Sequence, residues 1–345
     1  MKICLVKMLK GGERLAEPVI TENKEILIAG GTVLKPEYLD LIAFLGIDHV
    51  CIEDPYKAEE KYHPIINEKK IQEYKNRVQK ILENHIYQEK GSLDKIRPLA
   101  DNIVADVLCA DTLTVVDMKE RIPNLYEHTV MVTLLSVMVA IKLNVKKEYL
   151  TRIAIGCLLH DLGLRYIAVQ YANYNLEKLS PSEVFEYKKH SILAYSALEQ
   201  EMWIDSVSKK MILTHHERRD GSGFPLRHKS RELECNILQA CDAFDSCISG
   251  IEGKRIGIQQ TLEYFAETAD VLFERKIVKV IEKIVARYPV GTKVRLNSGE
   301  YGIVVCQTSN AIRPVIGVLD EDEKMTDVRY NLEKKKEIVI LQVED

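Results

Sequence analysis

The spacing of apolar and polar positions changes twice along the 345 residues of this chain. Short strand-like runs and turns, with one helical stretch, occupy residues 1–65, and apolar positions then recur at helix spacing over 66–116. A longer helical region covers 117–287, and strand-like runs return over 288–345. The pattern predicts a mainly α fold with a small N-terminal α+β module, a helical linker, a helical domain and a small C-terminal antiparallel β domain.

One carboxylate in the long helical region falls on an apolar face. The helix that ends near residue 160 carries Leu150, Ile153 and Leu158 on one side, and Asp161 follows on the same side. A carboxylate that points into a core costs free energy unless it is paired or bound to a metal ion. Asp161 is therefore the first candidate for chemistry.

Composition and charge exclude several classes of partner. The formal net charge of −4 argues against general binding to nucleic acid polymers or anionic membranes, although metal ions would allow a small anionic substrate. No run of about 18 apolar residues appears without charges, so we expect no membrane span, and the N-terminus lacks the long apolar region of a signal peptide. The 8 scattered cysteines form no C-x-x-C pair, so we expect reduced thiols in a cytoplasmic protein.

Five histidines and two aspartates lie in or at the ends of apolar helical segments. Imidazole and carboxylate groups suit iron, manganese and zinc, and one carboxylate can bridge two ions. Each residue taken alone is more often a satisfied core or surface residue, so spacing alone leaves a metal site and coincidence equally open. The other histidines, at positions 49, 63, 85 and 228, are expected to be structural or surface residues. The seven candidates are His128, His160, Asp161, His190, His215, His216 and Asp242.

Two motifs resemble those of a known family. The sequence from His160 to Gly163, HDLG, is similar to the HD-[IL]-G signature of HD-superfamily phosphohydrolases. Residues 215–225, HHERRDGSGFP, closely resemble the HHE-x-x-DGSGYP element of the HD-GYP family. His128, His190 and Asp242 follow the family's order, and the residues after Tyr288 resemble its tail. The resemblance implies a helical HD-domain bundle.

The resemblance also implies an activity. HD-GYP proteins are, as a family, phosphodiesterases that open cyclic di-GMP with two or three iron or manganese ions. The seven candidates would then be the metal ligands, with Asp161 as the bridging and catalytic carboxylate. A hydroxide formed from water by these ions would attack the phosphorus, so no side-chain nucleophile is needed.

The sequence departs from the family pattern where the family holds its substrate. Leu164 replaces the lysine after the HD-[IL]-G signature, and Phe224 replaces the signature tyrosine. An R-x-Y-R segment reads Ile251-Glu-Gly-Lys254 here. Arg165 and Lys254 are the candidates left for substrate binding, although a lysine lacks the planar fork of an arginine.

The metal count and the function follow from these matches and departures. Asn124 occupies the position of a glutamate that binds a third metal in some members, so we expect two iron or manganese ions. The leading hypothesis is a cyclic dinucleotide phosphodiesterase, with cyclic di-GMP as the default substrate. The alternatives are a catalytically weak or inactive receptor that signals through its flanking modules, and an HD hydrolase of another phosphate ester. The N-terminal module is expected to dock a signalling partner or to form a homodimer, and the β domain to cap the bundle or contact a partner.

Overall fold

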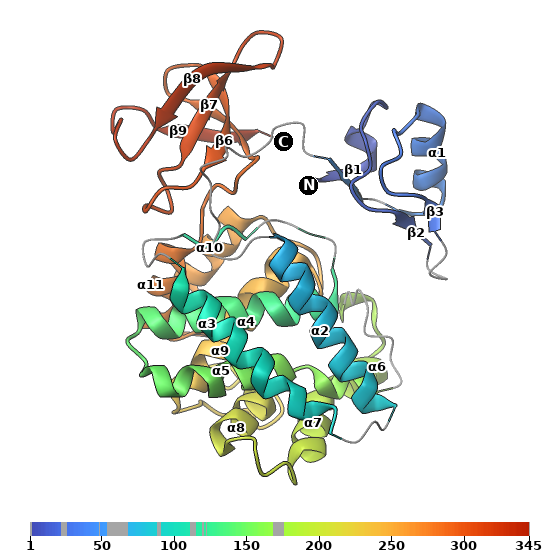
Figure 1. Ribbon diagram of the computed structural model, residues 1–345, viewed down its shortest axis with the longest axis vertical. Helices are drawn as coiled ribbons and strands as arrows, with labels where there is room; N and C mark the ends of the chain where they lie inside the picture. Colours follow the sequence, from blue (N-terminus) through green and yellow to red (C-terminus); the bar gives the residue numbers. More distant parts are fainter. Residues whose placement is uncertain are drawn as a thin grey trace.

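The computed structural model describes residues 2–21, 26–47, 49–53, 68–87, 91–110, 115–118, 121, 123–167 and 176–344. A large helical part lies beside two small β-containing parts, which are formed by the two ends of the chain (Figure 1). The mainly α fold expected from the sequence is confirmed. The expected boundary near residue 65 and the histidine at position 63 lie outside the described residues.

The N-terminal part has a small core of its own. Its core includes Leu15, Leu34 and Ile42, which are almost fully buried. Strands β1 and β4 pair antiparallel, as do β2 and β3. The elements are β1 (Lys2–Leu5), η1 (Val6–Met8), β2 (Val19–Ile20), β3 (Ile26–Ile28), α1 (Pro36–Phe44) and β4 (His49–Ile52).

The helical part shares one continuous hydrophobic core. Its helices are α2 (Glu68–Ile86), η2 (Leu93–Lys95), α3 (Ile96–Cys109), α4 (Leu125–Lys142), α5 (Lys147–Leu159), η3 (Leu162–Arg165), η4 (Leu176–Lys178), α6 (Pro181–Tyr187), α7 (His190–Leu198), α8 (Ser206–Thr214), α9 (Leu233–Ser249), α10 (Ile258–Glu267) and α11 (Arg275–Ile284). Tyr74 of α2 and Ile103 of α3 are buried in this core. The segment expected to be a linker therefore packs as part of the bundle.

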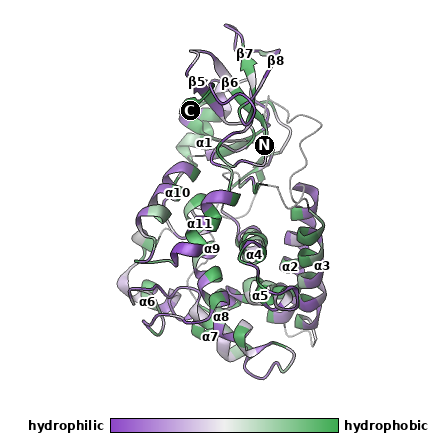
Figure 2. Ribbon diagram, turned by 90° about the vertical axis from the view of Figure 1, so that its left-hand side faces the viewer, coloured by the Kyte–Doolittle hydropathy of each residue, from purple (hydrophilic) through white to green (hydrophobic). Residues whose placement is uncertain are grey.

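Helix α4 lies in the middle of the bundle, against α2, α5 and α9. In Figure 2 the outer helices α2 and α10 carry both hydrophilic and hydrophobic residues, as expected for helices with one solvent face. Helix α4 is long and apolar enough to cross a membrane, yet 83% of its apolar window is buried inside the structure. These properties are those of a core helix.

Local signals set the ends of the helices that carry the candidate site. The side chain of Asn124 accepts a hydrogen bond from the Glu127 amide at 3.0 Å and caps α4. Ser180 and Glu183 form a reciprocal capping box that starts α6. Gly250 ends α9 with a left-handed φ of 71°, which turns the chain back toward the bundle.

The C-terminal part is a five-stranded antiparallel sheet in the order β8-β7-β6-β5-β9. Its strands are β5 (Lys293–Leu296), β6 (Tyr301–Cys306), β7 (Val315–Leu319), β8 (Met325–Asn331) and β9 (Ile340–Glu344). The inner faces bury Val294, Val304 and Ile316 in a separate small core. This agrees with the antiparallel β domain expected from the sequence.

A short backbone clasp joins the segment between α3 and α4 to the segment that follows α11. Val116 pairs in parallel with Val285, and the Ala286 amide donates to the Val116 carbonyl at 2.9 Å. The Val290 amide, at the entry to the sheet, donates to Asp117 Oδ2 at 3.0 Å. The clasp therefore ties the segment before α4 to the end of the last helix and to the β domain.

Candidate metal centre

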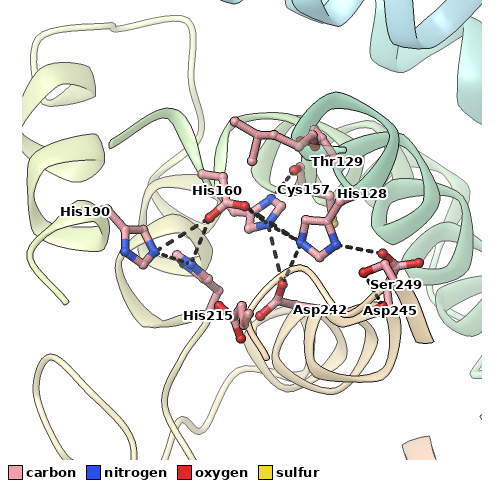
Figure 3. A network of polar contacts seen from close by, with 12 residues as sticks. His128, Thr129, Cys157, His160, His190, His215, Asp242, Asp245 and Ser249 are labelled. Carbon is pink, nitrogen blue, oxygen red and sulfur yellow. Dashed lines mark hydrogen bonds and ion pairs between the residues drawn. The ribbon is translucent and has the colours of Figure 1, made fainter. Parts of the chain in front are cut away.

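Five separate segments bring the seven candidate residues together in the interior of the bundle (Figure 3). His128 lies on the first turn of α4, and His160 and Asp161 directly follow α5. His190 begins α7. The adjacent pair His215 and His216 follows α8, and Asp242 lies within α9. All seven side chains are buried.

The ligand atoms form two groups, and within each group they lie within 4.8 Å of one another. One group is His128, His160 and Asp242, and the other is Asp161, His190, His215 and His216. Asp161 faces both. Its Oδ2 lies 3.2 Å from His160 Nε2, and its Oδ1 lies 3.6 Å from His190 Nε2. One carboxylate thus offers an oxygen to each group.

Three of the histidines are oriented by the same local contact. The Nδ1 atoms of His160, His190 and His215 lie 2.6, 2.7 and 2.7 Å from the backbone carbonyl three residues earlier. Since a carbonyl only accepts, each Nδ1 carries a proton, so Nε2 is the ring atom that faces the site; in the neutral rings of His190 and His215 this atom has a free lone pair. His190 Nε2 and His215 Nε2 then face each other at 3.0 Å as two acceptors. A cation between them satisfies both, so the geometry fits a metal ion.

His128 is oriented by a buried carboxylate instead. Its Nδ1 lies 2.7 Å from Asp245 Oδ2, and Asp245 also accepts hydrogen bonds from Arg121. Asp245 is fully buried. Such carboxylate–histidine pairs fix the ring and make its other nitrogen a better metal ligand. The sequence analysis did not assign Asp245, although it stands one helical turn after Asp242.

The electrostatics of the site leave most of its histidines neutral. Burial lowers the pKa of His190, and burial lowers the pKa of His215 and His216 well below the usual range, with neighbouring histidines adding to the effect on His215. Burial also opposes charge on His128, yet Asp242 and Asp245 raise its pKa to about 9. Neutral imidazoles beside carboxylates are the donor set that iron, manganese and zinc accept.

Asp161 and Asp242 are both held ionised. Burial alone would raise the pKa of each carboxyl, but the facing histidines outweigh it and lower both values. Asp242 Oδ2 is buried and has no hydrogen-bond partner within the described part of the chain. An unpartnered, ionised oxygen in a dry site costs free energy that a bound cation recovers.

Two glycines allow the metal-binding segments to approach closely. A Cβ on Gly163 would collide with the His190 carbonyl oxygen, and a Cβ on Gly223 would collide with the backbone of His216 and Arg218. The buried carboxylate of Glu217, which lies between these two glycines in the sequence, accepts hydrogen bonds from the backbone amides of Arg227 and His228 at 3.0 and 3.1 Å. Glu217 therefore holds the DGSGFP loop in place; the sequence analysis did not assign it a role.

The two residues expected to contact substrate, Arg165 and Lys254, lie on separate segments of the chain. Arg165 lies at the end of η3 and donates to the Tyr126 hydroxyl at 3.1 Å. Lys254 is exposed in the loop after α9. The Phe224 ring stacks on His216, with centroids 4.5 Å apart, and Lys188 lies 5.4 Å above the same ring. Lys188 was missed because it belongs to no motif.

Three further residues named in the sequence analysis, Asn124, His85 and His228, lie outside the two ligand groups. Asn124, at the position of a third-metal ligand, uses its side-chain oxygen to cap α4. His85 and His228 lie in neither ligand group, and His85 Nε2 instead lies 2.8 Å from the Tyr166 hydroxyl.

The region that carries the candidate site resembles known proteins. Residues 115–277 match the family model described as HD domain. The cyclic di-GMP phosphodiesterase PA4108 of Pseudomonas aeruginosa is 27% identical over 62% of this chain and 52% of its own length. The cyclic di-GMP phosphodiesterase PdeB of Borreliella burgdorferi is 24% identical over 58% of this chain and 53% of its own length. That of Thermotoga maritima is 31% identical over 36% of this chain and 34% of its own length. The chain thus spans about half the length of the first two relatives.

The helical bundle and its buried histidine–aspartate cluster fit the HD domain that residues 115–277 match. The relatives and the HDLG and HHERRDGSGFP motifs support membership of the HD-GYP family, with Phe224 where the family motif has tyrosine.

Proposed function

We propose that this protein is a metal-dependent phosphodiesterase that hydrolyses a cyclic dinucleotide, with cyclic di-GMP as the default substrate. The observation that carries the proposal is Asp161, whose two oxygens each face a separate histidine-containing group. That arrangement supports a pair of iron or manganese ions about 3.5–4 Å apart, as in other two-metal hydrolases. The names of three relatives, each a cyclic di-GMP phosphodiesterase, support the substrate class.

The residues of the chain have distinct tasks in this proposal. His128, His160 and Asp242 would hold one ion and His190, His215 and His216 the other, with Asp161 shared between them. When bound, two such ions lower the pKa of water and offset charge on the phosphoryl oxygens. The backbone carbonyls behind three histidines, and Asp245 behind His128, keep the rings fixed before substrate arrives.

Cations around the site would bind the anionic substrate. Arg165, Lys254 and Lys188 are the candidates, and Lys188 is supported by its position over Phe224. Phe224 keeps a flat ring beside His216 but has no hydroxyl to donate. We expect substrate binding to rely on Lys188 more than in relatives that retain the family lysine and arginine.

One observation favours a second function. Leu164 and Ile251, where the family pattern has cations, are apolar side chains buried to 4% and 5% exposure. These positions cannot hold a phosphate. A catalytically weak receptor that binds a cyclic dinucleotide and signals through its flanking parts is therefore the alternative, followed by an HD hydrolase of another phosphate ester.

We also propose a docking role for the N-terminal part and a cytoplasmic location for the protein. Helix α1 exposes Leu41 and Phe44, which supports docking of a signalling partner or of a second copy by the N-terminal part. Within the part of the chain that the structure describes, none of the eight cysteines forms a disulfide, which supports a reducing, cytoplasmic setting.

The test is to purify the protein anaerobically, count its iron and manganese, and assay the same sample on cyclic di-GMP, cyclic di-AMP and their linear products. His160→Ala and Asp161→Ala remove ligands from the site. His228→Ala removes an exposed histidine that lies in neither ligand group and is the matched control. We expect about two metals per chain, with turnover lost in the two site variants and kept in the control.

The outcomes separate the hypotheses. Metal with tight nucleotide binding but no turnover favours the receptor. Metal with turnover only on another phosphate ester favours the third function. Absence of metal after anaerobic purification and reloading refutes the metal centre itself.

A further inference from the structure

A glutamate outside the seven candidates lies at the edge of the metal centre. Glu252 follows the left-handed turn at Gly250, which ends α9 and brings the chain back over the site. The Glu252 carbonyl accepts the Leu176 amide at 3.1 Å, so the backbone at this position is held on its other side. The side chain is only 26% exposed.

The carboxylate of Glu252 points at a metal-ligand histidine. Its Oε1 lies 3.4 Å from His216 Nε2 and also accepts a hydrogen bond from the Tyr187 hydroxyl. Tyr187 is buried, and its ring lies 4.9 Å from that of His190. A buried tyrosine therefore fixes the direction of the carboxylate, as a supporting hydrogen bond does for metal ligands in general.

His216 differs from the other histidines of its group. Neither of its ring nitrogens is bonded to a backbone carbonyl, and within the described residues its buried Nε2 has no hydrogen-bond partner. The approach of Glu252 to this nitrogen lacks hydrogen-bond geometry. A buried nitrogen and a carboxylate oxygen 3.4 Å apart without a hydrogen bond are placed as two ligands of one ion would be.

The spacing agrees with ligands of one ion. Two ligands in adjacent positions at about 2.1 Å from a metal lie roughly 3 Å apart. The His190 and His215 Nε2 atoms are 3.0 Å apart, and Asp161 Oδ1 is 3.6 Å from His190 Nε2. The 3.4 Å between Glu252 and His216 falls between these values.

We propose that Glu252 is a further metal ligand, added to the group of Asp161, His190, His215 and His216. The inference rests on the proposed metal centre and extends it. It also gives a role to the segment where the family pattern has R-x-Y-R, because here that segment supplies an anion to the ions instead of a cation to the substrate. Glu252 would occupy a coordination position that is otherwise open to water or phosphate.

The test measures metal binding directly, without activity. Full-length metal-free wild type, Glu252→Gln and Glu263→Gln are titrated with Mn²⁺, and bound Mn²⁺ is counted by electron paramagnetic resonance. Glu263 on α10 accepts a hydrogen bond from exposed Gln259 and belongs to neither ligand group, so its variant loses the same charge outside the site. We expect Glu252→Gln to weaken one of two Mn²⁺ sites by roughly tenfold to a hundredfold, and Glu263→Gln to match wild type. Circular dichroism checks that each variant is folded.

A second measurement separates a ligand from a nearby charge. Co²⁺-loaded protein absorbs visible light in a way that depends on the number and kind of ligands, so Glu252→Gln should change that spectrum. An unchanged spectrum, or two unchanged Mn²⁺ affinities, overturns the assignment of Glu252 and leaves the two-metal centre intact. If wild type itself binds no Mn²⁺ or Co²⁺, the proposed function fails and the ligand fails with it.

Discussion

At the scale of single residues, the protonation of His128 and His160 should make metal binding depend on pH. In the metal-free site Asp242 and Asp245 outweigh burial and raise the pKa of His128 to about 9. Burial is likewise outweighed at His160, whose pKa lies well above its usual range because of Asp161 and Asp242. Below pH 9 the empty site therefore holds protons that a metal ion has to displace.

The apparent metal affinity should rise as the pH increases from 6.5 to 9. Each proton displaced adds one power of ten in affinity per pH unit, so we expect about one to two protons released per chain near pH 7. Titration calorimetry of Mn²⁺ in two buffers of different ionisation enthalpy counts them. Affinity that is constant over this range would contradict the proposed protonation of His128 and His160.

A second prediction at the scale of single residues concerns the Lys188 side chain. Lys188→Gln removes the cation above Phe224 beside His216 and should raise the KM, or the Kd, for a cyclic dinucleotide by roughly fivefold, the effect of about 1 kcal/mol at an exposed site. The kcat should change little because no metal ligand is altered. Lys279→Gln, an exposed lysine on α11, is the control. Equal KM in both variants would place the substrate elsewhere.

The candidate ligands could be selected from single residues because four of them stand in recognisable pairs. His160-Asp161 and His215-His216 are adjacent in sequence, and the segments between them follow a known order. Asp245 and Glu252 could not be predicted in the same way. Their roles depend on distances to His128 on α4 and His216 after α8, which only the folded chain defines.

At the scale of elements, one glycine fixes the distance between η3 and α7. Gly163→Ala would place a methyl group against the His190 carbonyl oxygen. We expect the free energy of unfolding to fall by about 1–3 kcal/mol or more, and metal content to fall with it, because relief requires α7 and His190 to move. Urea unfolding and metal analysis measure both.

The matched control is Gly253→Ala, whose added Cβ meets no atom within 4 Å. Its stability should stay close to that of wild type. If Gly163→Ala were equally stable and kept its metal, the close approach of these two elements would not be needed.

The sequence predicts where helices form, but not what their apolar faces pack against. The apolar spacing of residues 66–116 correctly indicates helices, yet it does not say what their apolar faces contact. The structure places Tyr74 and Ile103 in the bundle core. An amphipathic helix in a linker and one in a core have the same pattern, since the pattern records only that one face is buried.

At the scale of the whole molecule, the separate cores predict that the C-terminal sheet is dispensable for the metal centre. A chain ending at residue 287 keeps all seven candidate ligands and the pairing of Val116 with Val285. It loses the Val290–Asp117 contact and the small cluster that includes Ala311. We expect two bound metals and a free energy of unfolding lower by about 0.5–3 kcal/mol.

Metal analysis and thermal unfolding of this shortened chain check the prediction. Complete loss of metal would show that the sheet supports the site, and a midpoint equal to that of the full chain would show that the Val290 contact contributes nothing.

The clasp at Val116 also imposes an order on biosynthesis. Val116 is translated well before its partners Ile284 and Ala286, which are made only after all seven candidate ligands. During that interval the segment between α3 and α4 lacks these two backbone partners. A nascent chain halted before residue 284 therefore carries all seven candidate ligands in a helical part whose clasp has not yet formed.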